Sequence, residues 1–203
     1  ERITIEDVML VARQAEPVIL STETKQLIEQ SNQRLNTIAN SGRPVYGINT
    51  GFGIFANHVI DSSNIAKLNR NLILSHAVGI GEPLSSEIVR AAIFVRAATL
   101  SKGFSGVRLL IIQTLLEMLN KHVTPVVPSK GSLGSSGDLC QLSHMALVLS
   151  KDEKDLAEES GWAEVNGEKK TGKEAMNIAR IERVILSAKE GLALNNGATF
   201  TAA

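Results

Sequence analysis

Cysteine, aromatic side chains and long apolar runs are all scarce in this sequence. Cys140 is the single cysteine among 203 residues, which excludes an internal disulfide framework and fits a reducing compartment. No apolar run reaches the roughly 18 residues that a membrane span needs. The first residues lack the charged-then-apolar pattern of a secretory signal. We therefore expect a cytoplasmic protein that has no membrane partner.

An excess of charge of one sign is also missing. Lys and Arg together number 21, as do Asp and Glu, so no basic surplus is present to neutralise phosphates. We expect no nucleic-acid partner. The four scattered histidines (His58, His76, His122 and His144) lack the spacing of zinc ligands, so no metal is expected. Hydrophobic residues at 43% and charged residues at 21% are typical of a globular chain that can bury a core.

Apolar residues recur every three or four positions in several long stretches, and this period predicts a mainly helical chain. The expected helices cover residues 4–14, 22–40, 64–77, 86–102, 105–122, a stretch that Asp138 begins as N-cap, and 173–194. The apolar stripes at 91–100 and 109–119 are richer than one domain face needs, so we expect them to be buried against helices from a later part of the protein or from other subunits. Asn166-Gly167, inside 162–170, is the strongest hairpin signal.

Two glycine-rich segments interrupt the helical pattern, at 42–53 and at 131–138. The second does not match a phosphate-binding loop, because Asp138 follows Gly137 where that motif has a lysine. It does not match a hydrolase nucleophile elbow either, since no serine in it has glycine at both required offsets. On spacing alone, a purely structural turn remains open.

The tripeptide Ser135-Ser136-Gly137 suits a different chemistry. The amide nitrogen of Gly137 can attack the carbonyl carbon of Ser135 if the chain bends tightly, and glycine permits such a bend at low cost. Loss of water from that ring, and of the Ser136 hydroxyl, would leave an exocyclic methylene on an imidazolone. Asp138 at the N-cap would place this electrophile beside a helix N-terminus, which favours developing negative charge.

Residues 131–144, GSLGSSGDLCQLSH, resemble the signature of the aromatic amino acid ammonia-lyases, G-S-[VL]-G-A-S-G-D-L-x-P-L-x-H. Further landmarks follow in the family's order at 45–53, 71–76, 102–106, 125–128 and 190–197. The resemblance covers essentially the whole chain. It implies a mainly α fold: the N-terminal portion of an all-helical, fumarase/aspartase-like bundle, with glycine-rich loops and a small β-hairpin.

Members of the resembled family are more than twice as long as this chain. We therefore expect residues 1–108 to form an N-terminal helical region with the tyrosine loop. Residues 109–203 are expected to start the central bundle and to carry the ring-forming loop. The C-terminal portion is expected to be absent.

The resemblance also implies roles for individual residues. Ser135, Ser136 and Gly137 match the residues that form 4-methylidene-imidazol-5-one, so no dissociable cofactor is expected. Asp138 matches an aspartate implicated in ring formation. Tyr46 matches the catalytic base.

Asn196 matches an asparagine that hydrogen-bonds the ring oxygen. The family's active sites form in a homotetramer, in which the tyrosine and the ring-forming loop come from different subunits. The same arrangement is therefore expected for this protein.

Ser75 and His76 occupy the family's substrate-selectivity pair, and serine-histidine occurs in the histidine enzymes. A polar pair can hydrogen-bond an imidazole, whereas an aromatic-leucine pair would leave its nitrogens unpaired. The expected activity is therefore a histidine ammonia-lyase, which converts L-histidine to trans-urocanate and ammonia.

Three alternatives stay open: a phenylalanine or tyrosine ammonia-lyase, a 2,3-aminomutase, and an inactive helical scaffold. Three departures from the family pattern favour the last: Ser135 replaces an alanine, Gln141 replaces a proline, and Asn195 replaces an apolar residue. Cys140 in place of an alanine and Ala98 in place of an asparagine also depart from the pattern.

Overall fold

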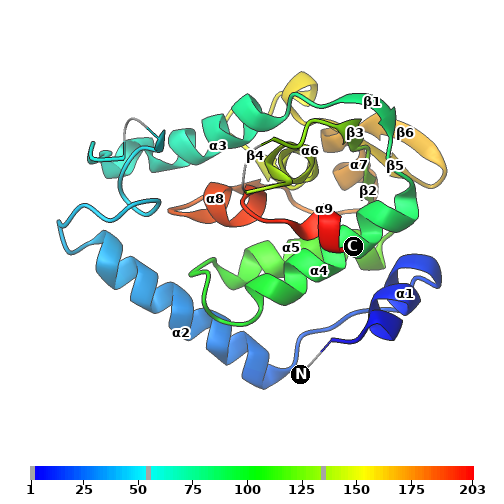
Figure 1. Cartoon of the computed structure of the whole chain (residues 1–203), viewed down its shortest axis with the longest axis horizontal. Coiled ribbons are helices and arrows are strands. Elements are labelled where there is room, and N and C mark those ends of the chain that lie inside the picture. Colours follow the sequence, from blue (N-terminus) through cyan, green and yellow to red (C-terminus); the bar gives the residue numbers. More distant parts are fainter. Residues whose placement is uncertain (1–2, 54–55, 134–135) are drawn as a thin grey trace.

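The computed structural model describes residues 3–53, 56–133 and 136–203, and its architecture is mainly helical (Figure 1). The helices are α1 (Ile5–Arg13), α2 (Thr22–Ala39), α3 (Ile65–His76), α4 (Ser86–Leu100), α5 (Leu109–Asn120), α6 (Leu139–Leu149), α7 (Gly172–Ile178), α8 (Glu190–Asn195) and α9 (Thr199–Ala202), with 3-10 turns η2 (Ser62–Asn64) and η3 (Ala157–Glu159). The predicted fold class is confirmed.

Short strands, most of which the sequence did not indicate, join the helices at one side. β1 (Ile80–Pro83) pairs antiparallel with β3 (Pro128–Lys130), and β4 (Ser150–Lys151) pairs parallel with β7 (Val184–Ile185). β2 (Thr124–Pro125), β5 (Trp162–Val165) and β6 (Glu168–Thr171) form an antiparallel sheet in the order β2-β5-β6. The predicted hairpin is β5-β6, with Asn166 and Gly167 both in the left-handed region at φ 52° and 78°.

The core lies where α4, α5 and α6 meet. Ile93 of α4, Ile112 and Leu115 of α5, and Leu142 of α6 are each 0% exposed. The stripes at 91–100 and 109–119 are thus largely covered within this chain, because α1, α5, α9 and β2 all pack on α4. The expectation that these stripes need helices from elsewhere is wrong.

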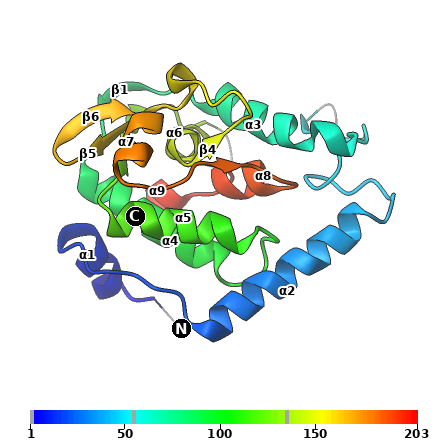
Figure 2. The same ribbon diagram turned by 180° about the vertical axis from the view of Figure 1, so that it is seen from behind.

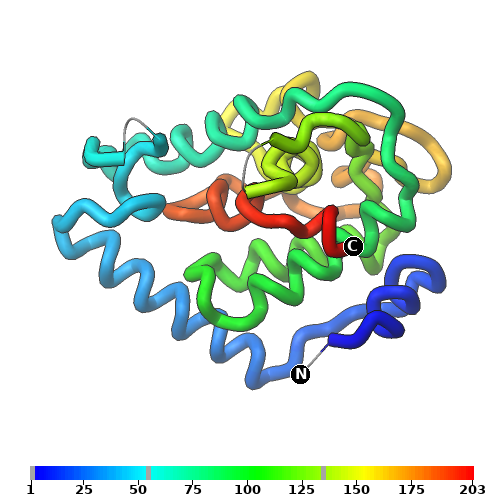
Figure 3. Tube along the Cα trace, in the orientation of Figure 1, coloured from blue at the N-terminus to red at the C-terminus, as the bar shows by residue number. Residues whose placement is uncertain are grey.

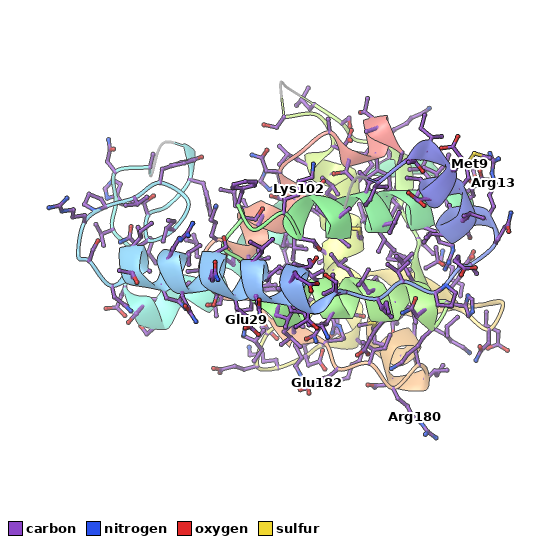
Figure 4. The ribbon with its side chains drawn as sticks, turned by 90° about the horizontal axis from the view of Figure 1, so that it is seen from below. Met9, Arg13, Glu29, Lys102, Arg180 and Glu182 are labelled. Atoms are coloured by element: carbon purple, nitrogen blue, oxygen red, sulfur yellow. The ribbon has the colours of Figure 1, made fainter. Side chains whose placement is uncertain are left out.

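The single helix predicted over residues 173–194 is also wrong. α7 ends at Ile178, because Arg180 adopts a left-handed φ of 53° and closes a Schellman-type C-cap. The cap bonds run from Arg180 N to Asn177 O and from Ile181 N to Met176 O, and the Arg180 side chain points outward in Figure 4. A second left-handed residue, Lys189, precedes α8.

α8 lies between α3 on one side and α5 on the other, as both Figure 1 and the reverse view in Figure 2 show. Gly191 N donates to Asn69 Oδ1 on α3, and a Cβ at Gly191 would lie 2.8 Å from Asn69 O. Arg108, which precedes α5, binds both carboxylate oxygens of the buried Glu190. These contacts fix α8, which leads directly into the candidate site.

No helix within the described ranges combines the length and the apolar character needed to cross a bilayer.

Candidate active site

The ring-forming segment lies at the entrance to α6. Ser135 lies outside the described residues; Ser136 and Gly137 are half-buried. Gly137 has φ +75°, a left-handed conformation that other residues adopt only with strain. The chain therefore turns sharply at the position where the proposed cyclisation needs a glycine.

The segment that follows α8 lies beside this turn. Gly137 and Gly197 form a parallel bridge, and Asp138 N donates to Gly197 O at 3.0 Å. In Figure 3 the red chain after α8 runs next to the yellow-green chain that enters α6. This pairing brings Asn196 close to Ser136 and Gly137, as the resemblance implies.

Asp138 is the N-cap residue of α6, as predicted, but its side chain makes no capping hydrogen bond to the helix. Its backbone has φ −93° and ψ 29° rather than the extended conformation of a capping residue. The buried carboxylate instead accepts hydrogen bonds from Thr201 N at 2.8 Å, Thr201 Oγ1 at 2.9 Å and Ser132 Oγ at 3.2 Å. These donors hold the carboxylate beside the ring-forming segment.

Arg96 and Thr201 are site residues that the sequence reasoning missed. Arg96 lies on α4, is 4% exposed, and donates from Nη2 to the Asn196 carbonyl oxygen at 3.0 Å. Burial lowers the pKa of Arg96 to about 10, although the nearby charge of Asp138 opposes this shift. An arginine within the mainly apolar stretch of α4, which holds both Arg90 and Arg96, was the available signal for a buried charge.

Two departures from the family signature have polar partners of their own. Gln141 Oε1 lies 3.1 Å from Ser132 Oγ and shares the single hydrogen of that hydroxyl with Asp138 Oδ1. Asn195 is 0% exposed and donates from Nδ2 to Ser143 Oγ at 3.3 Å, so this contact links α8 to α6. Its Oδ1 has no hydrogen-bond partner among the described residues.

The Tyr46 loop contacts α8. Gly47 has φ +74°, and a Cβ at this position would lie 2.7 Å from Leu192 Cδ2, so the loop fits closely against the helix. The buried Asn49 holds the loop's shape by accepting from Val45 N at 2.7 Å. Tyr46 itself is 57% exposed.

The Tyr46 ring packs edge-on against Phe52, with centroids 6.1 Å apart. The phenol therefore lies on the surface of this chain, where a ligand or another chain can reach it.

Ser75 and His76 are the last two residues of α3. The contacts of the His76 ring show which of its two nitrogens carries the hydrogen. His76 Nδ1 lies 2.8 Å from the Leu72 carbonyl oxygen and 3.1 Å from Ser75 Oγ. Because a carbonyl oxygen only accepts, Nδ1 carries the hydrogen, and the Nε2 of a neutral ring is an acceptor. Such an acceptor can receive a hydrogen bond from a substrate N–H.

The structure therefore brings some of the predicted site residues together and leaves others apart. Ser136, Gly137, Asp138 and Asn196 form one cluster. Within the part of the chain that the structure describes, no hydrogen bond or ring contact links Tyr46 or His76 to that cluster. The same residues contain no group of three or more His, Cys, Asp or Glu that could hold a metal ion.

Comparison with known proteins identifies what this arrangement resembles. A family model described as aromatic amino acid lyase matches residues 3–203. Histidine ammonia-lyase from Caldanaerobacter subterraneus subsp. tengcongensis is 48% identical over 96% of this chain, and that from Alkaliphilus oremlandii is 46% identical over 97%. The chain spans about 37% of the length of each.

Solved structures show the same likeness. Phenylalanine aminomutase from Pantoea agglomerans matches with a TM-score of 0.89 and 32% identity, over 98% of this chain and 37% of that one. Ergothionase from Treponema denticola matches with a TM-score of 0.90 and 29% identity, over 98% of this chain and 38% of that one. Histidine ammonia-lyase from Trypanosoma cruzi matches with a TM-score of 0.81 and 34% identity, over 95% and 35%.

Proposed function

This chain belongs to the aromatic amino acid lyase family, and we propose that the whole protein is a histidine ammonia-lyase that converts L-histidine to trans-urocanate and ammonia. The observation that carries the proposal is the pairing of the 136–138 turn with the segment after α8, which gathers Gly137, Asp138 and Asn196. Relatives named histidine ammonia-lyase, at 46–48% identity, support the choice of substrate.

The described residues fit a ring built from Ser135-Ser136-Gly137. The left-handed Gly137 supplies the sharp bend, and the buried Asp138 carboxylate lies at the adjoining residue. In the proposed cyclisation, Gly137 N bonds to the Ser135 carbonyl carbon and that oxygen leaves as water. Ser136 then loses its hydroxyl and its α-hydrogen as a second water.

The product of these steps, 4-methylidene-imidazol-5-one, would supply an electrophilic methylene that makes the substrate's β-hydrogen removable. Tyr46 would take that proton as general base. Asn196 would hydrogen-bond the ring oxygen from the segment paired with Gly137. Ser75 and His76 would bind the substrate imidazole, with His76 Nε2 accepting its N–H.

We further propose a cytoplasmic homotetramer in which Tyr46 and the ring-forming loop of one site come from different subunits. The exposure of Tyr46 supports this arrangement, since the phenol can be reached from outside this chain. The proposal includes no metal, no dissociable cofactor and no nucleic-acid partner.

An aminomutase of the same family is the second candidate, and the likeness to phenylalanine aminomutase favours it. The two reactions differ in whether the ammonia is released or returned to the β-carbon. The test is to incubate full-length protein with L-histidine, L-phenylalanine and L-tyrosine and to separate the products. Urocanate and free ammonia from histidine support the lyase, whereas a β-amino acid supports the aminomutase. Recovery of all three amino acids unchanged supports the inactive scaffold.

A further inference from the structure

Arg96 is a buried charge near the candidate site, and its hydrogen bond goes to the main chain. It lies on α4, a mainly apolar helix that also carries Arg90, and its Nη2 donates to the Asn196 carbonyl oxygen at 3.0 Å. A Cβ at Gly197 would lie 2.6 Å from that same Nη2, so the guanidinium packs directly on the Asn196–Gly197 peptide. Arg96 Nε has no hydrogen-bond partner among the described residues.

Asn196 lies between the end of α8 and the start of α9, so helical hydrogen bonds do not fix its carbonyl group. Contacts with other segments, such as that of Arg96, hold the main chain there. Asn196 has extended backbone, with φ −91° and ψ 114°, and its N–H still reaches back to Leu192 O at 2.9 Å. Arg96 holds the Asn196 carbonyl, and Asp138 N holds the next carbonyl, that of Gly197. The exposed Asn196 side chain leaves from this anchored stretch of backbone.

The positive charge of Arg96 also suits it to hold the Asn196 carbonyl group. Arg96 and Asp138 are both buried and attract each other, and desolvation lowers the pKa of Arg96 only to about 10. Arg96 therefore keeps its positive charge near neutral pH. A positive guanidinium makes a stronger hydrogen bond to a carbonyl than a neutral donor would.

We infer that Arg96 is a positioning residue for the proposed elimination: it anchors the Asn196–Gly197 peptide and thereby aims the Asn196 carboxamide at the ring-forming turn. This inference rests on the proposed function. In this proposal Arg96 acts through the Asn196–Gly197 peptide and not by contact with the substrate.

Arg90 offers a matched control on the same helix. It is also buried, at 8% exposure, and its guanidinium donates only to backbone carbonyls, those of Val11, Ala12 and Leu119. None of these carbonyls belongs to the candidate site. Loss of either arginine should therefore destabilise the fold, but only loss of Arg96 should change the site.

The experiment compares full-length wild type, Arg96→Met, Arg96→Lys and Arg90→Met. The readouts are the thermal midpoint, the mass loss from ring formation, the near-ultraviolet spectrum of the folded protein, and kcat and KM for histidine. For Arg96→Met we expect normal ring mass, a shifted folded-state spectrum, and kcat lower by about 10- to 100-fold with a smaller change in KM. Arg96→Lys should recover part of kcat, because its ammonium can still donate to the carbonyl.

Arg90→Met should lower the thermal midpoint while leaving the spectrum and kcat per folded protein unchanged. Equal effects of Arg96→Met and Arg90→Met on spectrum and kcat would overturn the inference. If Arg96→Met does not fold, Arg96→Gln takes its place, and a wild-type spectrum and kcat for Arg96→Gln would overturn it. A wild type that forms the ring but does not convert histidine refutes the proposed function instead, and the spectra still test Arg96.

Discussion

Thr201 holds Asp138 with both its backbone N–H and its hydroxyl, at 2.8 Å and 2.9 Å from the two carboxylate oxygens. The two residues are 63 positions apart, and this contact ties the start of α9 to the start of α6. Because the carboxylate is buried, each donor matters for its hydrogen bonding and its orientation. The proposed ring formation beside Asp138 therefore depends on a segment that lies far along the chain.

Removal of the Thr201 hydroxyl should slow ring formation. Thr201→Val keeps the shape and the backbone N–H but removes the donor to Asp138 Oδ1, so we expect a lower fraction of cyclised protein shortly after synthesis. Intact mass, followed over time in full-length protein, measures that fraction. Thr114→Val is the control: Thr114 is buried, unlike the exposed Thr201, and its hydroxyl bonds only to Leu110 O within α5. Each variant should cost about 1 kcal/mol of stability, and an equal cyclisation delay in both would contradict the prediction.

Replacement of Ser136 by alanine should abolish activity without unfolding the protein. Ser136→Ala removes the hydroxyl whose loss creates the methylene, so turnover should fall by several orders of magnitude while the thermal midpoint stays close to wild type. The expected mass shows no loss of water from the Ser136 side chain. Ser129→Ala, at an exposed serine on the preceding strand, should behave as wild type. Turnover retained by Ser136→Ala would remove the basis of the ring assignment.

Exchange of the pair at the end of α3 should change substrate preference. Ser75→Phe with His76→Leu removes the imidazole acceptor and adds apolar surface, so kcat/KM should fall for histidine and rise for phenylalanine. The loss for histidine should reach about 100-fold, as expected when a buried polar partner is left unpaired. If the ratio of kcat/KM for the two substrates stays at its wild-type value, this pair does not line the ring-binding pocket.

His144 should make the protein less stable in mild acid. Burial lowers the pKa of His144 below 6.5, and its Nε2 accepts from Gly79 N at 3.0 Å, which requires the neutral ring. The unfolded chain takes up this proton near pH 6.5 and the folded chain does not, so stability falls as pH drops from about 6.5 toward the folded-state pKa. Above that window the effect vanishes, because both states are neutral.

The measurement is urea unfolding of the full-length protein at about pH 8 and about pH 5.5. His144→Gln keeps an acceptor for Gly79 N but cannot titrate, so the difference in unfolding free energy between the two pH values should shrink. His122→Gln, at an exposed histidine, should leave that difference unchanged. A His144→Gln protein with the full wild-type difference would show that other groups cause the acid sensitivity.

Local sequence signals predicted those parts of the fold that depend on neighbouring residues. Thr4 and Asp7 form the capping box of α1 in the structure, and the Asn166-Gly167 turn closes its hairpin. The break after α7 was not predictable in this way, because Arg180 adopts a conformation that usually marks a glycine or asparagine. The spacing of apolar residues alone predicted one helix that continued across this break.

The candidate site shows the same limit. Motif resemblance indicated Gly137, Asp138 and Asn196, but not the contacts that hold them. Arg96 and Thr201 reach the site through pairings between distant elements, and no local pattern encodes such pairings. The division at residue 108 stays a prediction, as do the roles of Tyr46 and of the homotetramer.

The 203-residue chain alone should not be a competent enzyme, even if it folds and cyclises. The sequence suggested that exposed apolar stripes on α4 and α5 would be the cause, but most apolar residues of these helices are buried within this chain. Instead, Ile19, Phe104 and Leu133 are 85–87% exposed, and a groove of about 1110 Å³ with many apolar lining residues separates α1 and the start of α2 from α4. Figure 4 looks onto this side, with Met9 on α1 and Lys102 after α4 at its borders.

Apolar surface of this kind favours association or aggregation of the isolated chain. Among the described residues, no hydrogen bond or ring contact links Tyr46 to the ring-forming cluster, so we expect the proposed catalytic set to need more than one copy of the chain. Light scattering gives the mass of the isolated chain in solution, and the ultraviolet absorbance of urocanate gives its turnover. A stable monomer that converts histidine as fast as the full-length protein would contradict both the shared site and the need for the remaining part of the protein.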